Sequence, residues 1–407
     1  MTIHRRGLLA GAAATTLPFA SLRAQQANTL RLGVLTDMSG PYRDPTGPGS
    51  AICTQQAVME FASRLGVQAE VIQADHQNRP DVGSNIARQW YDQGVDVIVD
   101  VPTSSVALAI SQIAREKNKL FLNSGAATSD LTGSACSPNT VHWTYDTYML
   151  AKGTGAALTR AGGDTWFFIT ADYAFGHALQ RDTSSFVEQG GGRVLGSARY
   201  PFPQTTDFSS YLVQAQASRA KVLGLANAGT DTANCIKQAR EFGLTRNMRI
   251  AGLLMSFMEV HSLSLDTAQG LLLTESFYWD LNDRTRAFSQ RVQPRMPNRA
   301  MPAQVQAGCY SATVHYLKAA GALGAAAAKA DARAVAERMK SMETDDDAFG
   351  TGRIRPDGRK IHPTYLFQVK TPRESRGTWD YYNIAATNPA EEAFRPMAEG
   401  NCPLVRG

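Results

Sequence analysis

The chain of 407 residues has few of the features that mark a metal centre, a redox site or a membrane span. Its five cysteines include no close CxxC pair, which argues against a zinc or thiol-redox site. Beyond the N-terminal segment, no apolar run approaches the ~20 residues that are needed to cross a bilayer. The formal net charge is only +5 and no run of Lys and Arg forms a basic stripe, so nucleic acid is not an expected partner.

Motifs of the common enzyme classes are also missing. The sequence has no Gly-x-Ser-x-Gly elbow, no His-Glu-x-x-His, no Walker loop and no Gly-x-Gly-x-x-Gly after a strand. Its seven histidines show no ligand spacing. We therefore expect no enzyme, no cofactor and no metal, and a hydrolase is the least favoured function.

The cysteines divide into two groups by their surroundings. Cys53, Cys235 and Cys309 fall inside helical patterns and are expected to be small core residues. Cys136 and Cys402 lie among Ser, Pro, Gly and Asn in loop-like settings, and we expect them to form a disulfide. Such a bond requires an oxidising compartment.

Residues 1–24 have the composition of an export signal. Arg5 and Arg6 precede a mildly apolar stretch, and Ala24 offers a small residue for cleavage. The paired arginines favour the twin-arginine route, and an ordinary secretory signal is the alternative, because Ile3 stands where that motif prefers Ser or Thr. Either route predicts a periplasmic mature protein.

The rest of the chain alternates short apolar runs with stretches of helical periodicity, which is typical of a parallel α/β sheet. The alternation begins with a strand at 30–35 and a helix at 49–65, and continues to a strand at 120–122. It restarts after Tyr145 and runs to 271–273. A second sheet of the same kind is therefore expected.

The last part of the chain changes character. Long helical patterns at 285–293, 302–323 and 331–342 are expected to return to the first sheet. Two β-rich runs at 364–369 and 379–384 flank a turn-rich segment and predict a hairpin.

The expected fold is therefore α/β with two lobes, each a parallel sheet flanked by helices. The first lobe is expected to contain residues 28–145 and 283–345. The second is expected to contain residues 146–282 and 346–407. Several crossings between the lobes would form a hinge.

The residues that directly follow each strand are the informative ones, because ligands of open α/β sheets lie beyond the carboxyl ends of the strands. In this sequence these segments are short, small and polar. They are residues 36–42, 103–105, 123–128, 172–176 and 226–229.

These segments, in this order, resemble the periplasmic solute-binding proteins of ABC transporters of the leucine/isoleucine/valine-binding type. The most specific matches are Ser104-Ser105 at a helix start, residues 123–132, the Tyr-Ala-Phe-Gly turn at 173–176 and the strand at 364–369. The resemblance implies a type I periplasmic binding protein, with two flavodoxin-like lobes joined by a three-strand hinge. It also implies a small molecule in the cleft and a closed form that is delivered to the permease subunits. We expect the receptor to be a monomer.

The resemblance assigns the carboxylate of the solute to Ser104 and to the backbone of Gly125, Ala126 and Ala127. A helix start offers free N–H groups and a positive dipole end, so Ser104 and Ser105 suit an anion. The alternative is that both serines simply cap the helix.

Aromatic side chains are expected to wall the solute. Tyr42 follows the first strand, and Phe175 matches the aromatic residue with which family members cover the solute from the second lobe. Tyr173 and Trp143 add aromatic surface. For Trp143 and Tyr145, packing in the core or hinge is the alternative.

Residues 253–258 bear on the class of solute. Branched-chain amino acid binders carry an acceptor for the ammonium group there, and this segment has no acid before Glu259. Together with Ala127, where amino acid binders commonly have Thr, this favours a carboxylate without an ammonium, such as an aromatic acid. An amino acid binder and a sensor without a permease are the alternatives, and Asn227 and Phe257 complete the expected ligand-binding set.

Overall fold

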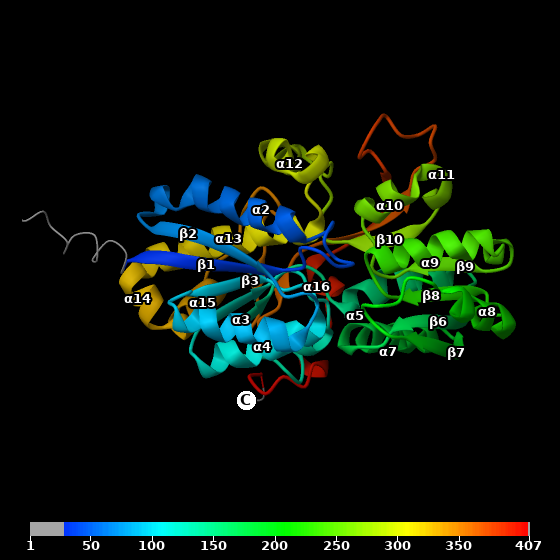
Figure 1. Ribbon diagram of the computed structural model, residues 1–407, viewed down its shortest axis with the longest axis horizontal. Coiled ribbons are helices and arrows are strands. Elements are labelled where there is room, and N and C mark those ends of the chain that lie inside the picture. The colour runs from blue at the N-terminus through cyan, green and yellow to red at the C-terminus, as the bar shows by residue number, and fades with distance from the viewer. Residues whose placement is uncertain (1–27, 406–407) are drawn as a thin grey trace, which may run out of the picture.

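The computed structural model describes residues 28–405, so the expected export signal at 1–24 lies outside the described part of the chain. Two α/β lobes lie side by side along the long axis of the molecule (Figure 1). Among the described helices, none is long and apolar enough to cross a membrane.

The first lobe is built on a parallel sheet with the strand order β2-β1-β3-β4-β5. Its strands are β1 (Thr29–Thr36), β2 (Gln68–Asp75), β3 (Val97–Asp100), β4 (Leu120–Asn123) and β5 (Thr140–His142). β3 and β4 are buried along their whole length, as expected for inner strands of a sheet that is covered on both faces.

Helices from distant parts of the chain cover this sheet. They are α2 (Gly47–Phe61), α3 (Pro80–Asp92), α4 (Ser104–Glu116), α13 (Gln304–Leu323), α14 (Ala325–Ala330) and α15 (Ala332–Ser341). Helix α12 (Asp283–Val292) packs on the outside of α2 and α13. Val97 and Val99 of β3 share a core with α13 and α15, whereas Ile98 shares a core with α3 and α4. Alternate side chains of one strand thus anchor the two helical layers.

The second lobe repeats this plan around a parallel sheet with the order β7-β6-β8-β9. Its strands are β6 (Thr165–Ala171), β7 (Arg193–Tyr200), β8 (Val222–Ala226) and β9 (Arg249–Gly252). Its helices are α5 (Thr147–Leu150), α6 (Ala156–Arg160), α7 (Ala174–Gln189), α8 (Ser209–Ser218), α9 (Thr230–Glu241), α10 (Phe257–Leu263) and α11 (Leu265–Ala268). The expected class, two parallel sheets flanked by helices, is confirmed.

A third, antiparallel sheet corrects one expectation. β10 (Leu272–Glu275) pairs with β13 (Thr364–Val369), which pairs with β14 (Tyr382–Asn388). The apolar run at 271–273 was expected to extend the parallel sheet of the second lobe. It pairs with the predicted hairpin instead, because a short apolar run does not specify its neighbour.

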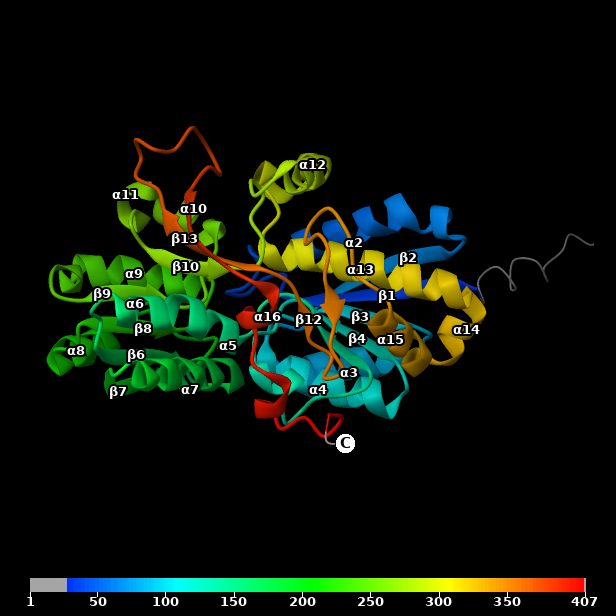
Figure 2. The same cartoon turned by 180° about the vertical axis from the view of Figure 1, so that it is seen from behind.

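The end of the chain does not stay with the second lobe as expected for residues 346–407. The short strands β11 (Arg353–Ile354) and β12 (Lys360–Ile361) adjoin the first lobe. There the backbone of Arg359 forms an isolated parallel β-bridge with His142 of β5. After β14 and α16 (Ala390–Ala393), the chain returns to the first lobe (Figure 2). Strands of two residues and an irregular tail carry no periodic signal, so the sequence could not place them.

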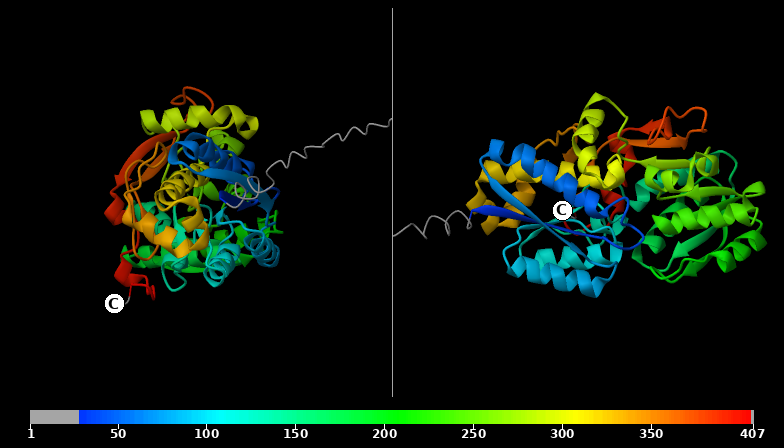
Figure 3. Two further views of the ribbon diagram at one scale, coloured as in Figure 1. Left: turned by 90° about the vertical axis from the view of Figure 1, so that its left-hand side faces the viewer. Right: turned by 45° about the horizontal axis from the view of Figure 1, so that its top comes forward.

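A disulfide anchors this returning segment. It joins Cys402 to Cys136 with a Cα–Cα distance of 5.6 Å, and Arg395 donates a hydrogen bond to the backbone oxygen of Ser129. Figure 3 shows this returning segment, in red, from two further sides. The chain therefore passes between the lobes after β5, β10 and β12 and once more after β14.

The remaining cysteines agree with their predicted role. Cys53 of α2, Cys235 of α9 and Cys309 of α13 are free and buried.

Candidate ligand-binding cleft

A cavity lies between the two lobes. Its wall is formed by residues that follow β1, β3 and β4 in the first lobe and β6, β8 and β9 in the second. The first turn of α13 contributes Gln304 and Val305. The cavity thus lies at the carboxyl ends of both parallel sheets, where open α/β folds bind ligands.

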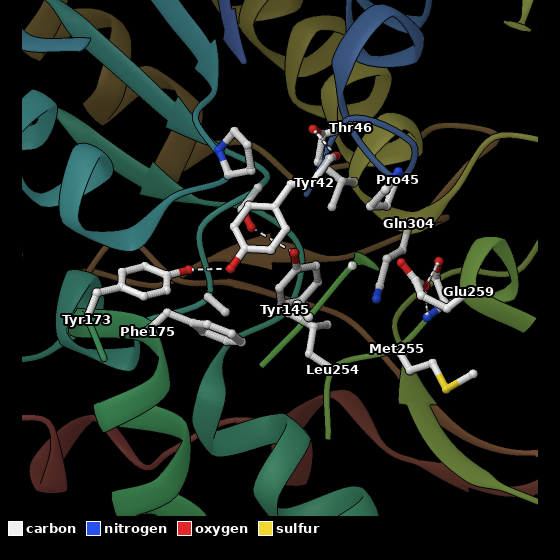
Figure 4. Close-up of a pocket in the computed structure, with 17 residues that line it drawn as sticks. Tyr42, Pro45, Thr46, Tyr145, Tyr173, Phe175, Leu254, Met255, Glu259 and Gln304 are labelled. Atoms are coloured by element: carbon white, nitrogen blue, oxygen red, sulfur yellow. Dashed lines mark hydrogen bonds between the residues drawn. The ribbon is translucent and has the colours of Figure 1, made fainter. Parts of the chain in front are cut away.

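Four aromatic side chains wall the cavity, and two of them join the lobes. The hydroxyls of Tyr42 and Tyr173 lie 2.6 Å apart across the cleft (Figure 4). Both rings stack on Phe202, with centroid distances of 5.3 Å for Tyr42 and 4.5 Å for Tyr173. Burial raises the pKa of both phenols, so they stay neutral and can each donate and accept a hydrogen bond.

The other two aromatic residues are Tyr145 and Phe175. Tyr145 lies where the chain first leaves the first lobe, and its hydroxyl donates to the backbone oxygen of Gly125 at 2.7 Å. Trp143 does not line the cavity: it is buried, and its indole N–H donates to Ser311 at 2.8 Å. Of the two residues for which packing was the alternative, Tyr145 reaches the wall and Trp143 packs in the core.

The loop after β4 offers backbone to the cavity at Gly125 and Ala127. The Asn123 side chain holds this loop, because it accepts from the Ala126 N–H at 2.9 Å and donates to the Ala126 oxygen at 2.8 Å. The Ala127 N–H makes no hydrogen bond with any residue from 28 to 405. A free amide beside small residues is suited to a carboxylate oxygen.

Gly125 is required by its neighbours. A Cβ atom at this position would lie 2.5 Å from Oδ1 of Asp100 and 2.6 Å from the Cα of Pro102. No larger residue fits without displacing one of them.

Ser104 and Ser105 start α4 as expected, but neither lines the cavity. The Ser104 hydroxyl is buried and accepts from the Thr128 N–H at 3.2 Å. This bond connects the loop after β4 to the start of α4. Of the residues between β3 and α4, Pro102 lines the cavity.

Three further expected residues also lie outside the wall. The Ala126 backbone is engaged by Asn123, as described. Asn227 accepts from the Thr232 hydroxyl at 2.7 Å and so supports the start of α9. Phe257 packs in the core of the second lobe against Tyr278 and Trp379.

The two lobes touch beside the cavity at Gly229. The Thr230 N–H donates to the backbone oxygen of Pro41 at 3.1 Å. Gly229 has a φ of +62°, and a Cβ there would lie 2.1 Å from that same oxygen. A glycine is needed here for both the backbone conformation and the close approach.

A polar end of the cavity was missed by the sequence argument. Residues 253–258 contain no acid, but the next residue, Glu259, lines the cavity. α10 begins at Phe257, and its capping box turns Glu259 back toward Ser256, whose N–H and hydroxyl donate to Oε2 at 2.7 and 2.6 Å. Burial raises the pKa of Glu259, and the bonds from Ser256 oppose this shift. The Ser-x-x-Glu spacing was the signal that could have found it.

Gln304 is the second missed polar residue. It is the first residue of α13 and lines the cavity. Its Oε1 accepts from the N–H and the hydroxyl of Ser276, both at 3.0 Å. No sequence signal marks it, because its place depends on how two crossing segments meet.

The chain belongs to the periplasmic binding protein family, since the sequence profile of that family matches residues 29–378. It is 46% identical to a periplasmic binding protein from Burkholderia mallei whose crystal structure superposes with a TM-score of 0.89, covering 93% of this chain and all of that one. A branched-chain amino acid ABC transporter periplasmic ligand-binding protein from Burkholderia xenovorans is 38% identical, with a TM-score of 0.80 and coverage of 92% and 99%.

More distant relatives agree with this assignment. Leu/Ile/Val-binding protein homologue 4 of Brucella abortus is 23% identical over 249 residues, and the match spans 58% of this chain and 60% of that relative. A solute-binding protein of an ABC transporter from Rhodopseudomonas palustris, solved with benzoate, is 19% identical with a TM-score of 0.79 and coverage of 89% and 97%. At that identity the likeness shows the fold alone. Together these relatives confirm the resemblance to the branched-chain amino acid type, and membership of the family implies export to the periplasm.

Proposed function

We propose that the chain is the extracytoplasmic receptor of an ABC uptake transporter and binds a small carboxylate, with an aromatic acid favoured, in the cavity between its lobes. One observation carries the proposal: the unbonded N–H of Ala127 lies beside a cavity walled by four aromatic side chains. The amide would receive a carboxylate oxygen, and the rings would enclose an apolar body.

Binding in this position would couple the solute to closure. The cavity is walled by both lobes, and the Tyr42–Tyr173 contact spans them. A solute that contacts both lobes stabilises the closed form over the open one, and this difference is what a permease can recognise. The receptor would act as a monomer and would release the solute unchanged.

An amino acid is the second candidate, and Glu259 on the cavity wall specifically favours it. A carboxylate in that position could accept from an ammonium group. The relative from Burkholderia xenovorans, whose description names branched-chain amino acids, supports this alternative, and the benzoate-bound relative supports the aromatic acid.

Calorimetric titration distinguishes the two candidates. We expect benzoate-type acids to bind in the micromolar range or tighter and leucine to bind at least tenfold more weakly. Tight binding of leucine without binding of any aromatic acid would overturn the preference. Turnover of a bound solute would contradict the receptor function itself.

Transport and export need tests in the cell. Loss of uptake of the bound acid on deletion of the gene supports a transport receptor, whereas unchanged uptake with a lost response to the acid supports a sensor. Replacing Arg5 and Arg6 with lysines should block export if the twin-arginine route is used.

A further inference from the structure

Gln304 presents an unused hydrogen-bond donor to the cavity. Its side chain is 2% exposed and lines the wall. A backbone N–H can only donate, so the amide oxygen must be the atom that faces the Ser276 N–H. The NH₂ group of Gln304 is then left without an acceptor among residues 28–405.

Glu259 presents an unused acceptor to the same cavity. It is 5% exposed, and both bonds from Ser256 end on Oε2. Oε1 has no donor in the described part of the chain. Glu259 and Gln304 lie on the opposite side of the cavity from Tyr173 (Figure 4).

We propose that Gln304 and Glu259 form a second polar subsite that recognises a hydroxyl group on the solute, so that hydroxylated aromatic acids are the preferred class. This inference rests on the proposed function, since it places the carboxylate at Ala127. A hydroxyl donates to Oε1 of Glu259 and accepts from Nε2 of Gln304, and it is therefore complementary to both atoms at once.

Other substituents match only half of this pair. An ammonium group can donate to Glu259 but cannot accept from the NH₂ group of Gln304, and it places a positive charge beside that donor. A second carboxylate has no donor for Glu259, and a hydrogen or methyl group pairs with neither polar atom. Sites that hydrogen-bond a substrate hydroxyl reject the analogue that lacks it, because their own polar groups are then unpaired.

Two isosteric substitutions test the subsite one atom at a time. Gln304→Glu keeps the oxygen that Ser276 requires and replaces the donor with an acceptor. Glu259→Gln keeps the oxygen that Ser256 requires and replaces the acceptor with a donor. Matched controls are Gln214→Glu on α8 and Glu188→Gln on α7, which make the same exchanges at exposed positions.

Calorimetry with benzoate and with 2-, 3- and 4-hydroxybenzoate gives the readout. For the wild-type protein and both controls, we expect the best hydroxybenzoate to bind at least tenfold tighter than benzoate. In each subsite variant we expect that ratio to fall below threefold, with binding of benzoate retained.

The outcomes separate the inference from the proposed function. If benzoate binds as tightly as every hydroxybenzoate, or if the preference survives both substitutions, the subsite is refuted while the aromatic-acid receptor stands. If no aromatic acid binds the wild-type protein, the proposed solute class fails and the subsite fails with it.

Discussion

Asp100 is a fully buried carboxyl group directly behind the cavity wall at Gly125. Burial raises its pKa to about 7, and the hydroxyls of Thr36 and Ser50 oppose the shift. Its φ is +83°, a conformation that asparagine also adopts with little strain. The residue therefore contributes a penalty to the folded state that depends on pH.

The direction of this pH dependence follows from how tightly the folded and the unfolded chain bind the proton of Asp100. The folded protein holds the proton more tightly than the unfolded chain, so the contribution of Asp100 is most favourable below its ordinary pKa of 3.8 and is lost as the pH rises through about 7. Asp100→Asn lacks this loss. We therefore expect its free energy of unfolding to rise by roughly 2–3 kcal/mol relative to the wild type as the pH increases from 5 to 8. Denaturant unfolding at several pH values measures it.

The exposed residue Asp266 provides the control. Asp266→Asn makes the same exchange at an exposed position and measures the effect of the substitution itself. Parallel curves for Asp100→Asn and the wild type would contradict the prediction.

The sequence predicted the aromatic and backbone part of the cavity wall but not its polar end. Tyr42, Gly125, Ala127, Tyr173 and Phe175 line the cavity because each follows a strand of a parallel sheet, and strand ends can be read from apolar runs. The polar end could not be read in that way. It is built by a helix cap and by the start of a crossing helix, and tertiary structure brings these together.

The start of α10 shows how one helix cap positions a functional side chain. Ser256 caps the helix through its hydroxyl, and the reciprocal bond from its N–H fixes Glu259. The capping box therefore stabilises the helix and aims the carboxylate at the same time.

Ser256→Ala should lower the free energy of unfolding by about 1 kcal/mol, because the helix loses its side-chain cap. Denaturant titration measures the change. Ser264→Ala is a matched control, since Ser264 occupies the N-cap position of α11 but its side chain makes no capping bond. Equal losses in the two variants would argue against the cap.

Among the elements, long helices and wholly apolar strands were predicted well, and the shortest strands without an apolar run were not. The strands at 30–35 and 120–122 and the helix at 302–323 match β1, β4 and α13 to within about two residues, because buried strands and long helices have clear periods. β5 and β12 have three and two residues and were missed. Segments this short contain no full period, and their pairing depends on neighbours that are distant in the sequence.

For the whole molecule, the disulfide between Cys136 and Cys402 closes a segment with a sequence separation of 266 residues. It holds the returning C-terminal segment against the first lobe. Replacing both cysteines with serine should destabilise the protein by about 2–5 kcal/mol, since the unfolded chain is then less constrained.

Thermal unfolding of the double variant, beside the wild type with and without reductant, tests this. The reduced wild type should match the variant, because the other three cysteines are buried and free. A variant as stable as the oxidised wild type would show that the returning segment needs no covalent anchor.

The C-terminal return also bears on how the two halves can move. A polypeptide that leaves the second lobe and is covalently fixed to the first adds a further connection between them, which restricts translation of one lobe past the other more than rotation. The expected motion is therefore a rotation of one lobe relative to the other about the crossing segments.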